Sequence, residues 1–277
     1  MNTEKKTYYR ALSIAGSDPS GGAGIQADLK TFSALGVYGS TAIVAIVDEN
    51  TQGVYGVHPV PVEFVTGQIR SVLGDVGADA IKIGMLHSSE LIRAVISTLS
   101  EYPDVNRIVV DPVMVATSGD PLLMPEAIST LRDELLPLAT VITPNLPEAS
   151  LLLGEEITHS DQLEEAARAL SALYPDRNVS VMLKAGHLSD DTLTDIFYNA
   201  VTDKTQRLSS PRVDTPNTHG TGCTYSSAIA AMLAKGADLD TAAIKAKQYL
   251  AEAIVSGADY NIGKGHGPVN HFHNLWK

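Results

Sequence analysis

One short segment, residues 217–224, combines several features that suit phosphate chemistry. It reads Asn-Thr-His-Gly-Thr-Gly-Cys-Thr, and the apolar spacing after it predicts a helix over 222–235. Gly220 and Gly222 allow a tight turn, and the first N–H groups of a helix have no partner inside it, so they can bind an anion. Cys223, the only cysteine, would lie in the first turn, where the helix dipole lowers a thiol pKa and favours action as a base. The alternatives are a helix start without a ligand and a cysteine that fills the core.

Three charged side chains follow predicted strands and indicate the same chemistry. Asp111 and Glu148 are carboxylates of the kind that hold Mg²⁺ in phosphoryl-transfer sites, and Lys184 could neutralise a migrating phosphoryl group. Each also has an ordinary interpretation, namely a turn aspartate before a proline, a first-turn helix glutamate and a strand-end lysine that reaches solvent. One phosphoryl-transfer site explains them together more simply than several independent coincidences do.

The glycine-rich run 16–24 lies between the first predicted strand and the first predicted helix. It matches neither the P-loop pattern nor the dinucleotide-binding pattern, so we interpret it as a tight loop over a small substrate, with Gly16 at the substrate. A plain surface turn is the alternative. Asp28, in the helix that follows, could direct its carboxylate into the substrate pocket or interact with the helix dipole.

The composition limits the class of protein. The chain has 277 residues, of which 44% are hydrophobic, and we expect a single domain over 1–277. One cysteine allows no internal disulfide, and the N-terminus resembles no signal peptide, so we expect a cytoplasmic protein. Nucleic acid and membrane are not expected partners, because a net charge of −12 repels anionic polymers and membranes and no long apolar run is present.

Short β-branched runs alternate with segments of helical period along the chain, which predicts an α/β fold with a mostly parallel central sheet flanked by helices. The turn around residues 203–204 predicts a short antiparallel edge. The expected strands are 11–15, 39–47, 80–83, 107–110, 140–142, 179–184, 193–198 and 207–213, and the expected helices are 24–35, 62–73, 89–99, 125–136, 147–152, 160–173, 222–235 and 240–256.

Ligands of open α/β sheets bind beyond the carboxyl ends of the strands, and the unusual residues of this sequence lie there. The loop 16–24 follows the first strand. We expect four polar side chains to gather along this edge, beside the turn before Cys223: Asp111, Asn145, Glu148 and Lys184.

Six segments spread over nearly the whole chain carry a family resemblance. They are 15–31 (AGSDPSGGAGIQADLKT), 82–86 (KIGML), 111–114 (DPVM), 142–149 (ITPNLPEA), 218–224 (THGTGCT) and 263–273 (GKGHGPVNHFH). With these motifs the chain resembles the hydroxymethylpyrimidine/phosphomethylpyrimidine kinases of thiamine biosynthesis, which belong to the ribokinase-like superfamily. The resemblance implies a ribokinase-like fold and two ATP-dependent phosphorylations, first of 4-amino-5-hydroxymethyl-2-methylpyrimidine and then of its monophosphate.

The resemblance also implies roles for individual residues. Cys223 would be the base, and backbone N–H groups at 220–222 (Gly220, Thr221 and Gly222) would form the anion hole for the γ-phosphoryl group. Asn145 and Glu148 match an Asn-x-x-Glu element that organises Mg²⁺ and phosphate, with Asp111 as a further metal contact partly through water. Asp28, Glu49, Met85 and Val113 match positions that line the pyrimidine pocket. ATP and Mg²⁺ are the implied cofactors, and a homodimer is the implied assembly.

Two departures from the family pattern keep an alternative open. Glu49 stands where many relatives have glutamine, and Lys184-Ala185-Gly186 replaces Lys-Gly-Gly. The first departure could favour a pyridoxine-like ring, so a pyridoxal or pyridoxine kinase is the nearest alternative. More distant alternatives are a thiol hydrolase that uses Cys223 with His219 or another histidine, and a ligand-binding regulator without activity.

Overall fold

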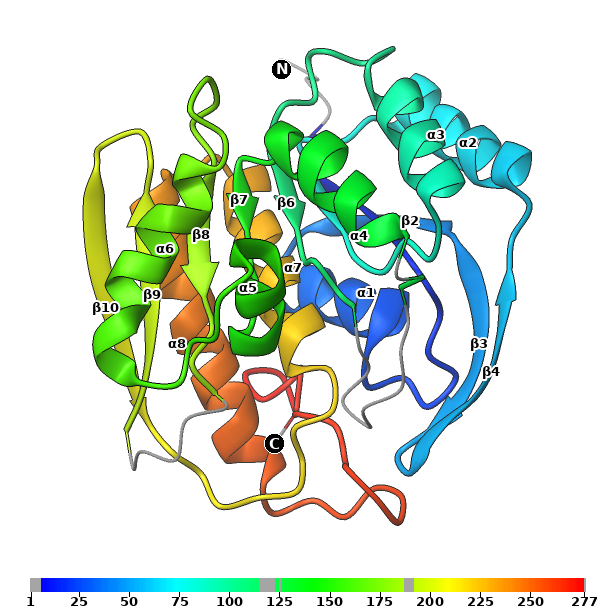
Figure 1. Ribbon diagram of the computed structural model, residues 1–277. Coiled ribbons are helices and arrows are strands. Elements are labelled where there is room, and N and C mark those ends of the chain that lie inside the picture. The colour runs from blue at the N-terminus through cyan, green and yellow to red at the C-terminus, as the bar shows by residue number, and fades with distance from the viewer. Residues whose placement is uncertain (1–5, 115–122, 125, 187–191, 277) are drawn as a thin grey trace, which may run out of the picture.

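An eight-stranded sheet forms the centre of the protein, with the strand order β10-β9-β8-β7-β6-β5-β1-β2 (Figure 1). The computed structural model describes residues 6–114, 123–124, 126–186 and 192–276. Neighbouring strands from β2 to β8 pair in parallel, whereas β9 is antiparallel to both β8 and β10. The expected mostly parallel sheet with an antiparallel edge is therefore confirmed. Its strands are β1 (Arg10–Ala15), β2 (Tyr38–Ile43), β5 (Ala80–Ile83), β6 (Ile108–Val110), β7 (Val141–Ile142), β8 (Ser180–Leu183), β9 (Thr192–Asn199) and β10 (Lys204–Pro211).

Helices cover both faces of this sheet (Figure 1). The core on one face is built with α2 to α6, and the core on the other face with α1, α7 and α8. The helices are α1 (Gly24–Ala34), α2 (Val62–Ser71), α3 (Ser89–Leu99), α4 (Ala127–Thr130), α5 (Leu146–Leu153), α6 (Leu163–Ala172), α7 (Thr221–Ala234) and α8 (Leu239–Gly257). Single π or 3-10 turns extend them at η1 (Val72–Val76), η2 (Leu131–Leu135), η3 (Leu136–Leu138) and η4 (Ser160–Gln162).

The central strands β5 to β8 are buried and mostly apolar on both sides, because each side faces a helical layer. In β6, Ile108 and Val110 join the core of α2 to α6, whereas Val109 joins the core of α1, α7 and α8. β5 alternates in the same way up to one exception, Lys82, which is charged and fully buried. A continuous apolar run is typical of such two-sided burial, since every side chain leaves water.

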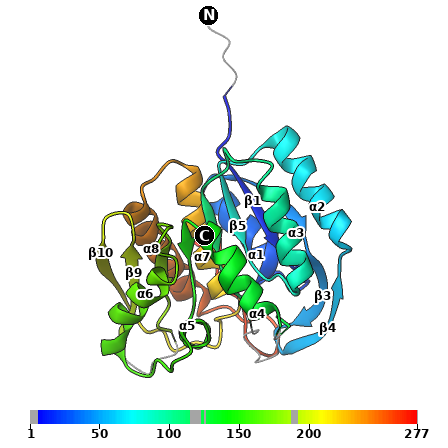
Figure 2. The ribbon, with the colours of Figure 1, turned by 45° about the horizontal axis from the view of Figure 1, so that its top comes forward.

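A second, two-stranded sheet departs from the expected elements. The predicted strand 39–47 divides at Val44 into β2 and β3 (Ala45–Asn50), and β3 pairs antiparallel with β4 (Gly53–Pro59), which was not predicted. Figure 2 shows this hairpin at the opposite end of the molecule from β10. The unbroken β-branched run concealed the change of sheet, because propensity reports an extended backbone and not its partner.

The other elements follow the predictions within a few residues. The predicted helix 125–136 is realised as α4, η2 and η3, while its expected first residue, Pro125, lies outside the described residues. In the part of the chain that the structure describes, none of the helices has the length and apolar character needed to cross a membrane.

Candidate active site

The carboxyl ends of the parallel strands bring together the polar residues that the sequence indicated. Asp111 directly follows β6, Lys184 directly follows β8, and Asn145 begins the turn into α5 after β7. Asn145 and Lys184 form a parallel bridge that extends the pairing of β7 with β8. Residues that follow three neighbouring strands therefore lie side by side at this edge of the sheet, where they could contact one ligand.

Asp111 and Lys184 form an ion pair beneath the start of α7. Lys184 Nζ lies 2.9 Å from Asp111 Oδ1, to which Thr143 Oγ1 also donates at 2.8 Å. Burial raises the pKa of Asp111, but the ammoniums of Lys184 and Lys82 outweigh it and lower the pKa. A Cβ on Gly222 would lie 3.3 Å from Lys184 Nζ and 3.4 Å from Asp111 Oδ2. The expected anion hole and the expected phosphate-binding lysine therefore adjoin each other.

Asn145 and Glu148 cap α5 with a reciprocal pair of hydrogen bonds. Asn145 Oδ1 accepts from the Glu148 N–H at 2.9 Å, and Glu148 Oε2 accepts from the Asn145 N–H at 2.8 Å. Burial raises the pKa of Glu148 to about 7, with a further increase from Asp111 and an opposing effect of Lys184. Glu148 thus caps the start of α5, as expected of a first-turn glutamate. Its pKa also depends on the charges of Asp111 and Lys184.

Gly220 allows the turn before α7 to pack directly against the loop 16–24. Its φ is +75°, and a Cβ there would overlap the carbonyl oxygen of Gly22. The helix begins at Thr221, one residue before the expected start. The Thr221 N–H, one of the expected anion donors, donates to the Thr218 carbonyl at 3.3 Å, so a bound anion would share it with the turn.

The thiol of Cys223 lies half-buried in the first turn of α7. Burial raises its pKa to about 11. The Lys82 ammonium and a hydrogen bond from the Gly24 backbone act against this rise, whereas Asp28 and Asp111 add to it. The pKa of the thiol is therefore raised and not lowered as expected, because lost solvation outweighs the helix start.

Asp28 differs from the expectation that its carboxylate points into the substrate pocket. The side chain is fully buried between α1, β5 and α7, where Lys82 Nζ donates to both carboxylate oxygens at 3.0 Å. Ser13 Oγ and Ser227 Oγ donate to the same carboxylate at 2.5 and 2.6 Å. Asp28 lies on the second turn of α1, on the side that faces the sheet. Its charge is therefore balanced by Lys82 inside the protein.

The other residues expected at the pyrimidine lie around the ends of β1, β5 and β6. A Cβ on Gly16 would come within 2.8 Å of the Met85 terminal methyl group, so the two residues pack closely. Val113 follows Asp111 and packs against the same core cluster as Met85. A glycine, a thioether and a branched side chain thus form an apolar region at this edge of the sheet.

Glu49 belongs to a cluster with Asp18 and His219, whose carboxylate and imidazole atoms lie within 4.8 Å of one another. His219 Nε2 donates to Asp18 Oδ2 at 2.8 Å, because an ionised carboxylate can only accept. Asp18 also accepts from the backbone N–H groups of Gly22 and Ala23. Burial, together with Asp18, raises the pKa of Glu49 to about 7, and His219 opposes this. The cluster joins the first loop, the β3–β4 hairpin and the turn before α7.

The C-terminal segment completes the site. The backbone N–H groups of Lys264 and Gly265 donate to Thr51 Oγ1 in the β3–β4 turn, each at 3.2 Å. Further along, the Gly267 carbonyl accepts from the His219 N–H at 3.0 Å. One short stretch of chain therefore connects the hairpin that carries Glu49 with the start of α7.

Two buried charged residues near the candidate site, Asp18 and Lys82, were not expected from the sequence. Asp18 was included only in a glycine-rich loop, and Lys82 only in a motif, although both are fully buried charged residues. The signal for Lys82 was available, since a lysine inside the apolar strand β5 requires a buried counter-charge. Asp18 carried no comparable signal, because aspartate is an ordinary turn residue.

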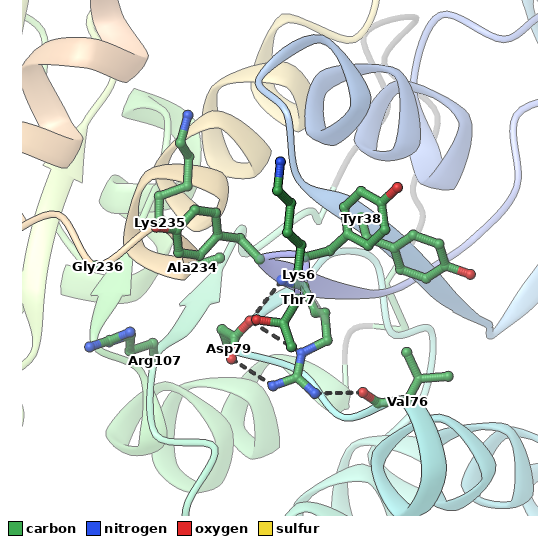
Figure 3. Close-up of a pocket in the computed structure, with 12 residues that line it drawn as sticks. Lys6, Thr7, Tyr38, Val76, Asp79, Arg107, Ala234, Lys235 and Gly236 are labelled. Atoms are coloured by element: carbon green, nitrogen blue, oxygen red, sulfur yellow. Dashed lines mark hydrogen bonds and ion pairs between the residues drawn. The ribbon is translucent and has the colours of Figure 1, made fainter. Parts of the chain in front are cut away.

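A separate cavity of about 620 Å³ lies at the amino ends of the strands, away from this site (Figure 3). Arg10 lines this cavity, where its Nη2 pairs with Asp79 at 2.8 Å and its Nη1 donates to the Val76 carbonyl at 2.7 Å. The guanidinium of Arg10 is therefore bound by protein groups and does not face the cavity as a free cation. None of the residues expected in the active site lines this cavity.

Comparisons with known proteins agree with this geometry. The family model described as phosphomethylpyrimidine kinase matches residues 18–270. The chain is 51% identical over 267 residues to a hydroxymethylpyrimidine/phosphomethylpyrimidine kinase of Rhizobium meliloti, covering 96% of this chain and 98% of that protein.

Solved structures show the same fold. The ADP complex of Bacillus subtilis pyridoxal kinase superposes with a TM-score of 0.87 at 39% identity, covering 98% of this chain and all of the other. A phosphomethylpyrimidine kinase of Clostridium difficile has a TM-score of 0.76 at 40% identity, covering 88% of this chain and 99% of the other. The fold is ribokinase-like and the protein is a kinase. On the family match and the near full-length identity, the chain belongs to the phosphomethylpyrimidine kinase family.

Proposed function

We propose that this protein uses ATP to phosphorylate the hydroxymethyl group of 4-amino-5-hydroxymethyl-2-methylpyrimidine and then converts the monophosphate to the diphosphate, as a step of thiamine biosynthesis. The observation that carries the proposal is the position of Gly222 over the Asp111 and Lys184 pair. Backbone donors at a helix start and an adjacent ammonium provide the two features that a transferring phosphoryl group requires.

In the proposed reaction the hydroxymethyl oxygen attacks the γ-phosphorus, the bond between the γ-phosphorus and ADP breaks, and Cys223 accepts the proton of the hydroxyl group. The γ-phosphoryl group lies against the turn of Gly220, Thr221 and Gly222, where Lys184 neutralises developing charge. The support for this arrangement is the short distance from Lys184 Nζ to the position that a Cβ on Gly222 would take, together with the place of Cys223 in the same turn.

The donor set fits Mg²⁺, which Glu148 and Asp111 would hold partly through water, near Asn145. Burial and, to a smaller extent, the Asp111 carboxylate raise the pKa of Glu148, and a hard divalent cation would favour its ionised form. When bound, the ion would neutralise phosphate oxygens. A metal partly bound through water is compatible with the hydrogen bonds that both carboxylates already accept.

For the pyrimidine ring we propose contacts with Gly16, Met85 and Val113, and a hydrogen bond from the exocyclic amine to Glu49. Asp28 has no place in this pocket, since its carboxylate is enclosed by Lys82 and two serines. Two properties of the whole protein complete the proposal, a homodimer in solution and a location in the cytoplasm, for which a chain with a single cysteine is suited.

A pyridoxal kinase remains the second candidate, because the Bacillus subtilis pyridoxal kinase shares the fold closely. A thiol hydrolase that pairs Cys223 with His219 is not favoured, since His219 Nε2 is bound to Asp18. ADP release should be measured by a coupled assay with the aminopyrimidine alcohol, its monophosphate, pyridoxal and pyridoxine. Turnover of both pyrimidines is expected. Brisk turnover of pyridoxal with none of the aminopyrimidine would replace the first proposal with the second.

A further inference from the structure

A buried ion pair joins the long helix α8 to the antiparallel edge of the sheet. Lys247, in the middle of α8, and Asp195, on β9, are both buried, and Lys247 Nζ lies 2.7 Å from Asp195 Oδ2. α8 packs against β9 at this contact (Figure 1). The proposed phosphoryl transfer does not use these two charges. Their burial requires a separate explanation, since it is costly to take charges out of water.

The other carboxylate oxygen of Asp195 binds the backbone of a neighbouring strand end. Asp195 Oδ1 accepts from the Ala185 N–H at 2.9 Å. Hydrogen bonds to an ionised carboxylate are roughly twice as strong as those between neutral groups. An ion pair that only joined α8 to the sheet would not require this bond. The carboxylate therefore also holds the chain just after β8.

This bond continues the contact between β8 and β9 beyond the point where β8 ends. The antiparallel register pairs Leu183, the last residue of β8, with Ile196. One position further, the same register sets Lys184 opposite Asp195. The side chain of Asp195 thus takes over from backbone pairing at the lysine of the candidate phosphate site.

Both peptide groups that flank the Lys184 Cα are held by hydrogen bonds. The Lys184 N–H donates to the Pro144 carbonyl at 2.9 Å. The next N–H, that of Ala185, donates to Asp195, and the Ala185 side chain is buried in the core of α2 to α6. Because the two peptide planes determine the direction of the Cα–Cβ bond between them, the Lys184 side chain leaves the backbone in a set direction, toward Asp111.

We propose that Asp195, held by Lys247, is a positioning residue that fixes the backbone after β8 and so keeps the Lys184 ammonium in place for the transferring phosphoryl group. The proposal rests on the proposed function in one respect, that Lys184 acts on this group. Asp195 acts through Lys184 and not on the substrates. Such support matters because a displacement of about 1 Å in a reacting site can reduce a rate by about 10²-fold.

Two double variants separate the hydrogen bond from the ion pair. Asp195→Asn with Lys247→Met removes both charges but keeps an oxygen that can accept from the Ala185 N–H. Asp195→Leu with Lys247→Met removes the same charges and the acceptor as well, while the leucine side chain is branched at the same atom as aspartate. Both variants lose the ion pair with α8, so a difference between them reports the bond to Ala185.

The leucine double variant should have a kcat about tenfold to hundredfold below that of the asparagine double variant, with a nearly unchanged KM for the pyrimidine alcohol. The comparison is then repeated in a Lys184→Met background. Because Asp195 acts through Lys184, the two double variants should have equal kcat values there. Equal kcat values with Lys184 present, or an undiminished difference without it, would overturn the proposal.

Hydrogen exchange of the Ala185 amide, followed by NMR, gives a readout without ATP or substrate. The amide should be protected in the wild type and in the asparagine double variant, and should exchange at least about tenfold faster in the leucine double variant. If the leucine double variant does not fold, the wild type decides, because an Ala185 amide that exchanges as fast as those of exposed loops would overturn the proposal. This readout does not depend on the identity of the substrate, so failure of the substrate assay is a separate result.

The matched control lies at the opposite end of the sheet. Asp79 Oδ1 pairs with Arg10 Nη2 at 2.8 Å, and Asp79 Oδ2 accepts from the Arg10 backbone N–H at 2.7 Å. This carboxylate combines an ion pair with a bond to a strand, as Asp195 does, but it lines the separate cavity at the amino ends of the strands. Asp79→Leu with Arg10→Met should lower stability and leave kcat unchanged. A fall in kcat as large as that of the leucine double variant would overturn the specific link between Asp195 and Lys184.

Discussion

Lys184 Nζ lies 2.9 Å from Asp111 Oδ1, which joins the ends of two strands that are 73 residues apart in the sequence. The ammonium reaches the start of α7 from this pair, and 15% of its side chain stays exposed. The Lys184 ammonium is thus held by the buried Asp111 on one side and is accessible to a ligand on the other. This arrangement positions a cation for phosphate without leaving it mobile.

Lys184→Met should therefore reduce kcat more than it affects binding of the alcohol. Removal of one preorganised group that stabilises transition-state charge costs about 10²–10³ in kcat. Lys184→Arg keeps the charge and should lose less. Circular dichroism must confirm that the methionine variant folds, since Asp111 loses its partner. Equal kcat values for the methionine variant and the wild type would remove Lys184 from the phosphate site.

Cys223→Ala tests the base. General-base catalysis contributes about 10²–10⁴ to the rate, so kcat should fall by that factor while the KM for ATP changes little. Cys223→Ser keeps the shape of the side chain and replaces the thiol with a hydroxyl group, and it should lose nearly as much. A near wild-type rate in the alanine variant would assign the barrier to positioning and electrostatics alone.

Glu148→Gln separates the two tasks of this side chain. The glutamine oxygen can still accept from the Asn145 N–H, so the cap of α5 and the melting temperature should be retained. Turnover should require more Mg²⁺, because one carboxylate is lost. Glu148→Ala, which loses the hydrogen bond from the Asn145 N–H to the Glu148 carboxylate, should also lower stability by about 0.5–1.5 kcal/mol. An unchanged Mg²⁺ titration in the glutamine variant would contradict the metal role.

Glu49 should make stability depend on pH. Folding raises the pKa of its carboxyl group from the ordinary 4.5 to about 7. Between these values the folded protein holds a proton that the unfolded chain has lost, so the free energy of unfolding falls as pH rises through this window. Urea denaturation should show Glu49→Gln gaining stability relative to the wild type between pH 5 and pH 8. The exposed Glu155→Gln is the control, and equal shifts in both variants would refute the assignment.

Gly220→Ala should be far more harmful than Gly236→Ala. Both glycines have positive φ values, +75° and +84°, so both alanines carry the same backbone strain, about 1 kcal/mol. A Cβ at Gly236 meets nothing within 4 Å, whereas at Gly220 it overlaps the Gly22 carbonyl oxygen. The difference in unfolding free energy between the two variants measures this contact. Similar values would mean that the first loop moves freely.

The sequence predicted the sheet edge well because local patterns determine it. Strands end where runs of β-branched residues end, so the sequence alone placed Asp111, Asn145 and Lys184 directly after their strands. The antiparallel edge was equally visible in the turn between β9 and β10. The β3–β4 hairpin was not, since the run around Val44 is extended in both sheets and only tertiary pairing distinguishes them.

The charges inside the site were less predictable. Asp28 was expected at a ligand, but its partner Lys82 lies 54 residues away, and pairing over that separation appears only in the fold. The thiol of Cys223 shows the same limit, because the helix start is local and the burial that outweighs it is not. Local rules thus located the groups, and the three-dimensional surroundings decided their protonation.

The link from Lys264 and Gly265 to Thr51, and from Gly267 to His219, has a consequence for biosynthesis. The two contacts with Thr51 join residues that lie 213 and 214 positions apart in the sequence. The N-terminal strands can form on the ribosome, since domains generally fold as the chain emerges. The hairpin and the helix start can acquire their final spacing only after Gly267 has left the exit tunnel, so the nascent chain has no completed site before then.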